Sequence, residues 1–207
     1  MIKTNPNQFP AEDREILLEL IDYLAKNPSI FIDPQKILRH RGLSSKKILS
    51  LFDFLEKEKI GKKIYPFQSL NMDIKLIPYF KFYFFDEELF KSQPTLFRPD
   101  QKGALLEQEF FSRIYEDNLI INTFRTIDSI EVDFIVQKPN SKTLWAFEIK
   151  KDQFIYAADL AGLHYFDKHI TGEKSLIVAH CGSRNNYEGK IHVMPTDEAI
   201  HVFQQTL

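Results

Sequence analysis

The sequence predicts two domains that combine helices and strands: a mostly helical N-terminal domain and a C-terminal α/β core with a mixed central sheet. Three observations predict this architecture. Apolar side chains recur at helical spacing in the first half, runs rich in Val, Ile and Phe alternate with helical patterns in the second half, and a stretch with two prolines separates the halves. With 207 residues, 19 of them Phe, the chain is long enough to bury a core in each of two small domains.

The N-terminal domain begins with three helical segments. Residues 11–26 carry apolar side chains at helical spacing and predict an amphipathic helix. Asp33, followed by a proline, predicts the N-cap and first turn of a short helix that ends near Arg39. Ser44 predicts the N-cap of a third helix, and Gly61 predicts its end.

A basic hairpin follows these helices. Ile, Tyr and Phe are frequent over residues 62–67 and 74–85, which predicts two strands joined at Ser69-Leu70-Asn71. Three short helices followed by a basic hairpin match the layout of a winged helix-turn-helix, found in DNA-binding domains and in domains that only bridge others. We therefore predict a winged-helix domain over residues 1–92.

The C-terminal domain, residues 93–207, alternates helical and strand patterns. The segment Lys138-Pro139-Asn140-Ser141 has turn chemistry and joins two of the strands. The order helix, three strands, helix, two strands, helix predicts an α/β core with a mixed sheet. Helices are expected at 103–116, about 152–168 and from Thr196, strands at 119–126, 130–137, 143–150, 174–180 and 190–194, and a turn at 183–189.

Charge is unevenly distributed along the chain. The formal net charge of −2 combines sixteen basic and fourteen acidic residues in 1–100 with eleven basic and fifteen acidic residues in 101–207. Residues 35–63 hold nine basic and three acidic residues, an excess that can attract phosphate, although a solvated helical face explains it as well. The candidate phosphate contacts are Arg39, Arg41, Lys46, Lys47 and, on a later strand, Arg125, for which an ion pair with Asp128 or Glu131 is the alternative.

Two acids and a lysine fall on adjacent predicted strands. Alternate residues of a strand share a face, so Asp133 lies with Ile135, while Glu148 and Lys150 share a face of the next strand. If the two strands pair through the Pro139-Asn140 turn, Asp133 and Glu148 converge, and Lys150 lies one pleat further along. Such groups are costly when buried without partners, so mutual pairing, solvent or a metal must compensate.

Glu107 adds a third acid from the preceding helix. It shares a helical stripe with Ala104, Phe111 and Ile114, which places it among apolar neighbours. Carboxylates, together with the backbone carbonyl of Ile149, suit Mg²⁺ or Mn²⁺, which can stabilise the charge on a cleaved phosphodiester while a lysine orients water. The alternative for the whole set is a surface hairpin with a Lys–Glu pair.

These residues resemble a known family. The segments Gly103-Ala-Leu-Leu-Glu107, Glu131-Val-Asp-Phe-Ile-Val136 and Phe147-Glu-Ile-Lys150 resemble the PD-(D/E)XK nuclease superfamily, which implies a restriction-endonuclease-like fold. More narrowly, residues from about 12 to 205 are similar to the winged helix and C-terminal domain of unknown function of bacterial and archaeal AAA-type ATPases. Further similarity lies in Tyr83-Phe-Phe-Asp86, Leu160-Ala-Gly-Leu163 and Ile191-His-Val-Met-Pro195.

The resemblance implies a DNA-interacting, Mg²⁺-dependent nuclease-like module. By position, Asp133 and Glu148 would be the metal-binding acids, Lys150 the catalytic lysine and Glu107 the acid of the first helix. The sequence Gly-x-x-x-x-Gly-Lys-Ser/Thr does not occur, so the ATPase module is absent and ATP hydrolysis is not expected of this chain. The chain is either a piece of a longer protein or a stand-alone relative, for which an ATPase acting in trans is a candidate partner. The alternative is a non-catalytic regulatory or interaction module descended from a nuclease, which the acidic second half favours.

The remaining features bear on location and on other sites. No apolar run reaches the roughly 18 residues of a spanning helix, and the first ten residues do not resemble a signal peptide. Together with the lone Cys181, this predicts a cytoplasmic protein. The six histidines lack close ligand spacing, so a zinc site is not expected. Tyr156, which follows the lysine, is expected to pack in the core.

Overall fold

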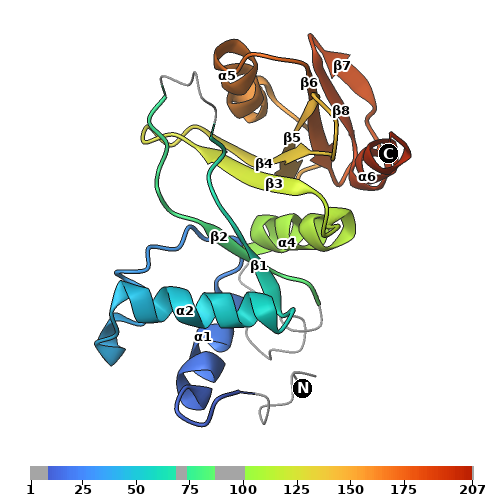
Figure 1. Cartoon of the computed structure of the whole chain (residues 1–207). Coiled ribbons are helices and arrows are strands. Elements are labelled where there is room, and N and C mark those ends of the chain that lie inside the picture. Colours follow the sequence, from blue (N-terminus) through green and yellow to red (C-terminus); the bar gives the residue numbers. More distant parts are fainter. Residues whose placement is uncertain (1–8, 69–73, 87–100, 207) are drawn as a thin grey trace. The chain divides into compact units, whose positions relative to one another are not determined.

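The computed structural model describes residues 9–68, 74–86 and 101–206 (Figure 1). The chain divides into two compact units, Met1–Lys63 with Tyr79–Ser112 and Ile64–Pro78 with Arg113–Leu207. The boundary that we predict between residues 92 and 93 lies outside the described residues. Of the described residues, 79–86 and 101–112 cluster with the first unit, and the second unit resumes at Arg113, inside a helix.

Two α-helices of the first unit form where the sequence predicts them. They are α1 (Arg14–Lys26) and α2 (Ser45–Lys57), and the Ser44 hydroxyl caps α2 by accepting the N–H of Lys47 at 3.2 Å. The short helix predicted from Asp33 to Arg39 is wrong. That segment forms turns and then a 3-10 turn, η2 (Arg39–Arg41), because Leu38 adopts a left-handed conformation (φ 49°) that interrupts helical hydrogen bonding.

The predicted hairpin of the first unit is shorter than its sequence pattern. Strands β1 (Gly61–Ile64) and β2 (Lys81–Phe84) form a two-stranded sheet. Gly61 is required there, since a Cβ at this position would lie 2.3 Å from the carbonyl oxygen of Tyr83. The core of the unit joins the hairpin to α1 and α2 and includes Leu20, Ile48, Phe52, Phe80 and Phe82.

The chain between β1 and β2 contributes to the second unit. Two arms, residues 65–68 and 74–78, lie along strand β3 (Ile120–Arg125). The N–H of Phe67 donates to the carbonyl of Thr123 at 2.7 Å, and the N–H of Ile77 donates to that of Arg125 at 3.0 Å. The turn predicted at Ser69-Leu70-Asn71 lies outside the described residues.

The second unit is built on a six-stranded sheet, which is mixed, as predicted, and has one strand more than the five predicted. Its strand order is β3-β4-β5-β6-β8-β7, in which β3, β4 and β5 are antiparallel neighbours and β5, β6 and β8 run parallel. Strand β7 lies in the segment predicted to be only a turn; it pairs antiparallel with β8 and extends the sheet by one edge strand. The bounds are β4 (Glu131–Gln137), β5 (Leu144–Lys150), β6 (Lys174–His180), β7 (Asn186–Glu188) and β8 (Ile191–Pro195).

Helices α5 (Ala161–His169) and α6 (Thr196–Gln205) cover opposite faces of this sheet (Figure 1). Leu163 and Phe166 of α5 join the cluster that contains Ala146, whereas Phe203 of α6 packs on the ring of Trp145 at 5.4 Å. Because neighbouring residues of β5 contact different helices, the alternation read from the sequence is confirmed.

One helix begins later than the sequence predicts. Helix α4 (Lys102–Ile114) agrees with the pattern at 103–116, but the helix predicted over 152–168 begins later, with a 3-10 turn, η4 (Ala157–Leu160), that leads into α5. The reason is local: Tyr156 is extended, and its N–H is held by the carboxylate of Asp159. Within the described residues, no helix is long and apolar enough to cross a membrane.

Candidate functional site

The hairpin of β4 and β5 brings Asp133 and Glu148 together. These strands pair antiparallel with Phe134 opposite Phe147, so the same register continued by one residue places Asp133 opposite Glu148. The N–H of Ile149 donates a hydrogen bond of 2.8 Å to Asp133 Oδ2, which holds this buried carboxylate against β5. The convergence expected from the sequence therefore occurs.

Glu148 is a strongly perturbed acid of this hairpin. Its carboxylate is buried, with Oε1 2.8 Å from Lys150 Nζ, while Oε2 is inaccessible and has no hydrogen-bond partner among the described residues. Burial raises the pKa of Glu148 well above its ordinary value, and the nearby charge of Asp133 raises it further, against the opposing effect of Lys150. A buried carboxylate oxygen without a partner is costly, so this position is suited to receiving a cation.

Lys150 lies at the end of β5, where its side chain is 26% exposed. Burial alone would lower the pKa of Lys150, but the contacts with Glu148, Asp133 and Asp159 outweigh burial and raise it. The ammonium therefore stays charged at neutral pH. The Lys–Glu pair of the alternative interpretation exists, but the Glu148 side chain is only 11% exposed, so the pair is not a surface one.

Asp159 is a member of this site that the sequence analysis missed. Its Oδ1 lies 3.8 Å from Lys150 Nζ, and its Oδ2 accepts the N–H of Tyr156 at 2.8 Å. Gly162 allows the start of α5 to pack closely on β4, since a Cβ at this position would lie 1.9 Å from the carbonyl oxygen of Glu131. An acid three residues after the N-cap of a helical turn is a capping signal. Asp159 stands in this position relative to the N-cap Tyr156, so the signal could have placed Asp159 at this turn.

Arg125, a predicted phosphate contact, forms an ion pair within the sheet. Its Nη1 lies 2.8 Å from Glu131 Oε2, on the neighbouring strand. The alternative weighed in the sequence analysis, an ion pair with Glu131, is therefore confirmed. A phosphate contact by Arg125 stays a prediction.

Glu107 lies on α4, in the part of that helix that belongs to the first unit. It is buried, as its place on an apolar stripe predicts. Its Oε1 lies 2.6 Å from the ammonium of Lys81 and also accepts a hydrogen bond from the hydroxyl of Tyr83. Glu107 thus links α4 to β2 through these contacts. Its membership of the metal-binding set stays a prediction.

The four basic residues predicted to contact nucleic acid in the first unit fall into two pairs. Arg41 lies 2.7 Å from Glu15 and 2.6 Å from Glu19, and Lys47 lies 2.6 Å from Asp13, so both are neutralised by acids at or near α1. Arg39 and Lys46 are exposed and form no ion pair with any described residue.

The segment after Lys150 differs from expectation. The side chain of Tyr156 does not pack in the core: its exposed fraction is 69%, equal to that of Phe154. The buried residue of this segment is Ile155, which joins the core under α5. The prediction of core packing was wrong by one residue, because the backbone at Tyr156 is extended and its side chain points away from the face that Ile155 buries.

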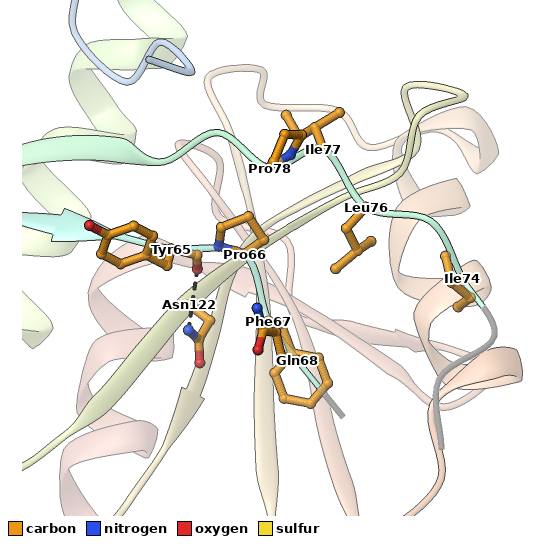
Figure 2. Close-up of a pocket in the computed structure, with 9 residues that line it drawn as sticks. All are labelled: Tyr65, Pro66, Phe67, Gln68, Ile74, Leu76, Ile77, Pro78 and Asn122. Carbon is orange, nitrogen blue, oxygen red and sulfur yellow. Dashed lines mark hydrogen bonds between the residues drawn. The ribbon is translucent and has the colours of Figure 1, made fainter. Parts of the chain in front are cut away.

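A pocket of about 590 Å³ lies elsewhere in the second unit, where the two arms cross β3 (Figure 2). The side-chain amide of Asn122 donates to the carbonyl of Tyr65 at 3.2 Å, as the dashed line in Figure 2 shows. None of the predicted site residues lines this pocket. The lining is Tyr65, Pro66, Phe67, Gln68, Ile74, Leu76, Ile77, Pro78 and Asn122.

Metal-binding capacity rests on few ligands. In the described part of the chain, no three His, Cys, Asp or Glu residues group closely enough to hold a metal ion by themselves. The hairpin supplies two acids, Asp133 and Glu148, and any further ligands would be backbone carbonyls, water or substrate.

Residues 102–199 match a family described as Domain of unknown function (DUF4143), which is typically found with AAA-type ATPases. The matched region contains the β4–β5 hairpin with Asp133, Glu148 and Lys150. A search of curated proteins found no match. The chain is thus similar over its second half to a domain that accompanies AAA-type ATPases, as the resemblance implies.

Proposed function

We propose that this protein is a DNA-interacting, metal-dependent phosphodiesterase of the PD-(D/E)XK kind, with its site on the β4–β5 hairpin. Asp133, Glu148 and the carbonyl of Ile149 would hold Mg²⁺ or Mn²⁺, and Lys150 would be the catalytic lysine. The observation that carries the proposal is the buried Glu148 Oε2, which has no hydrogen-bond partner among the described residues and lies beside a second carboxylate.

The donor set fits such a metal. Mg²⁺ is usually held by one or two carboxylates and keeps several waters, so a site with two acids is sufficient. The N–H and C=O of one strand residue point toward the same neighbour. Since the N–H of Ile149 reaches Asp133, its carbonyl is expected on the same side. When bound, the metal would activate water and neutralise charge on the phosphodiester.

Lys150 can act on the substrate without rearrangement of the sheet. Its ammonium is positioned by Glu148 and, at longer range, by Asp159, and its side chain retains access to solvent. A charged amine fixed in this way can orient an attacking water or stabilise negative charge that develops on the phosphate. This differs from a buried structural lysine, which has no access to a ligand.

The order of the elements supports the finer fold proposals. A helix, three antiparallel strands, a helix and a parallel strand, from α4 to β6, is the arrangement that the nuclease resemblance implies. In the first unit, α1, η2, α2 and the β1–β2 hairpin support a winged helix. We assign its phosphate contacts first to Arg39 and Lys46, because Arg41 and Lys47 are engaged by acids.

The experiment is a cleavage assay with single-stranded, duplex and supercoiled DNA in Mg²⁺ or Mn²⁺, beside calorimetric measurement of metal binding. Asp133→Ala and Glu148→Gln should abolish cleavage and metal binding. Asp167→Asn is a matched control, because Asp167 is also paired with a lysine but lies on α5. Equal cleavage by wild type and Asp133→Ala would show contamination and refute the assigned site.

A second function, a non-catalytic regulatory module that acts on an AAA-type ATPase in trans, is favoured by two observations. Arg41 and Lys47 are neutralised within the first unit, which weakens its attraction for phosphate, and the second half matches a domain typically found with such ATPases. Metal binding that is lost in Glu148→Gln counts against this function. Absence of both metal binding and cleavage in wild type supports it.

A further inference from the structure

Two aromatic rings project into solvent directly after the candidate site. Phe154 and Tyr156 lie in the segment between β5 and η4, which bends over residues 151–154, and 69% of each is exposed. Single exposed apolar side chains are ordinary in soluble proteins, but two large rings within three residues are a less common feature. The other large exposed apolar residues of the described chain are Tyr65, Ile120, Ile127 and Tyr187, which are distributed over other elements.

The backbone beneath these rings is held at two points and closely approached at a third. Ile155 inserts into the core under α5, and the N–H of Tyr156 is bonded to Asp159. The turn after β6 leaves room for the segment, since a Cβ on Gly182 would lie 2.7 Å from the carbonyl oxygen of Gln153. The rings are therefore exposed on a fixed support, which reduces the entropy lost when a ligand binds them.

The segment lies at the edge of the sheet where parallel strands end. Lys150 and His180 are register partners at the carboxyl ends of β5 and β6, and such edges commonly carry ligand sites in α/β folds. One carboxylate connects the two features, because Asp159 contacts the ammonium of Lys150 with one oxygen and the backbone of Tyr156 with the other. The rings therefore belong to a backbone segment that shares a carboxylate contact with Lys150.

We propose that Phe154 and Tyr156 form a base-stacking platform for single-stranded nucleic acid, whose phosphate backbone passes Lys150. This rests on the proposed function and names the form of its substrate. Exposed aromatic rings stack on the faces of unpaired bases, whereas the bases of a duplex are already stacked on each other. The exposed ammonium of Lys151, next in the chain, adds a phosphate contact on the same segment.

The test is fluorescence anisotropy of labelled dT12 and of a 12-base-pair duplex with the full chain in EDTA, which prevents cleavage. The double variant Phe154→Ala/Tyr156→Ala should bind dT12 about tenfold or more weakly, since each base–aromatic stack contributes enough for such a change, and should bind the duplex as wild type does. Tyr187→Ala, which removes an equally exposed ring on β7, is the matched control and should bind dT12 like wild type. Tyr156→Phe, which keeps the ring, should bind dT12 like wild type.

Asp133→Asn separates this inference from the proposed function. If Asp133→Asn loses Mg²⁺ binding and cleavage but binds dT12 like wild type, both proposals are supported, because the platform acts apart from the metal. If the double alanine variant binds and cleaves single strands as well as wild type, the platform is refuted while the proposed function stands. Tight binding of an unfolded polypeptide at these rings, without binding of dT12, would refute it in favour of a protein partner.

Discussion

Glu107 and Glu148 are both buried and both contact a lysine ammonium, but their environments differ. In the first unit, Glu107 directs one oxygen to two donors, Lys81 and Tyr83, and the lysine is almost completely buried with it. In the second unit, Glu148 shares its lysine with Asp159, lies beside another acid, and has an oxygen without a partner among the described residues. The lysine that contacts Glu148 also remains open to solvent.

Because of this difference, Glu107 serves to link two secondary-structure elements, whereas Glu148 is suited to binding a ligand. A buried charge surrounded by donors is compensated within the protein, and removing a donor exposes the full desolvation cost of the remaining charge. A buried carboxylate beside another carboxylate is compensated only in part, and a cation would complete it. Both acids come from apolar-looking segments, so the neighbouring residues, rather than burial, distinguish them.

The largest effect is expected from Lys81→Met. The substitution leaves Glu107 buried beside Tyr83 without its ammonium and should lower the free energy of unfolding by about 3–5 kcal/mol in urea titrations. The matched substitution Lys150→Met should cost about 1 kcal/mol, because Glu148 can take up a proton and Lys150 is partly exposed. Adding Glu107→Leu to Lys81→Met should recover most of the loss, and equal losses for the two single lysine variants would contradict the comparison.

The second effect concerns pH. Because the pKa of Glu148 is raised in the folded protein, the folded state binds more protons than the unfolded state between the ordinary and the raised value. The free energy of unfolding should therefore fall as pH rises through this window. Glu148→Gln should remove that loss in urea titrations in EDTA over the same pH range. A wild-type stability that rises with pH as steeply as that of the variant would contradict the raised pKa.

Asp167 provides an acid–lysine contact of a third kind, close to solvent. Its carboxylate lies 3.0 Å from Lys174 and 3.3 Å from Lys190, and hydrogen bonding to Lys174 lowers its pKa against the effect of burial. A lowered pKa contributes stability above the ordinary value that is lost as pH falls through the folded value. Asp167→Asn should cost about 1 kcal/mol near pH 7 and nothing near pH 2, measured by urea unfolding. A cost independent of pH would indicate lost packing instead.

The smallest effects are expected at the exposed pairs of the first unit. Arg41→Ala should leave the urea midpoint of unfolding almost unchanged, because its ion pairs with Glu15 and Glu19 are open to solvent. In DNA-binding titrations against salt, Arg39→Ala and Lys46→Ala should each lower the salt slope by about 1, whereas Lys47→Ala should not. A larger change of slope for Lys47→Ala would show that its pair with Asp13 opens on binding.

Much of the architecture follows from local patterns in the sequence. The apolar spacing predicts α1, α2 and α4, and the period of two predicts β4 and β5. It gives the faces of β5, whereas in β4 a register shift against β3 places Val132 in the same cluster as Ile135. The turn at Lys138–Ser141, where Asn140 takes a left-handed conformation, sets the pairing that brings Asp133 opposite Glu148. These features depend on residues close in the chain, which is why their order alone predicts them.

The sequence by itself determined which side chains are acids, amines and rings, and which faces of the strands they occupy. The tertiary structure decided their partners: Lys81 for Glu107, Glu131 for Arg125, and Asp159 for Lys150. It also decided that residues 64–78 join the second unit and that Tyr156 is exposed while Ile155 is buried. The physical reason is that periodicity reports how a segment divides its faces, whereas contacts between segments distant in the chain depend on how those faces pack.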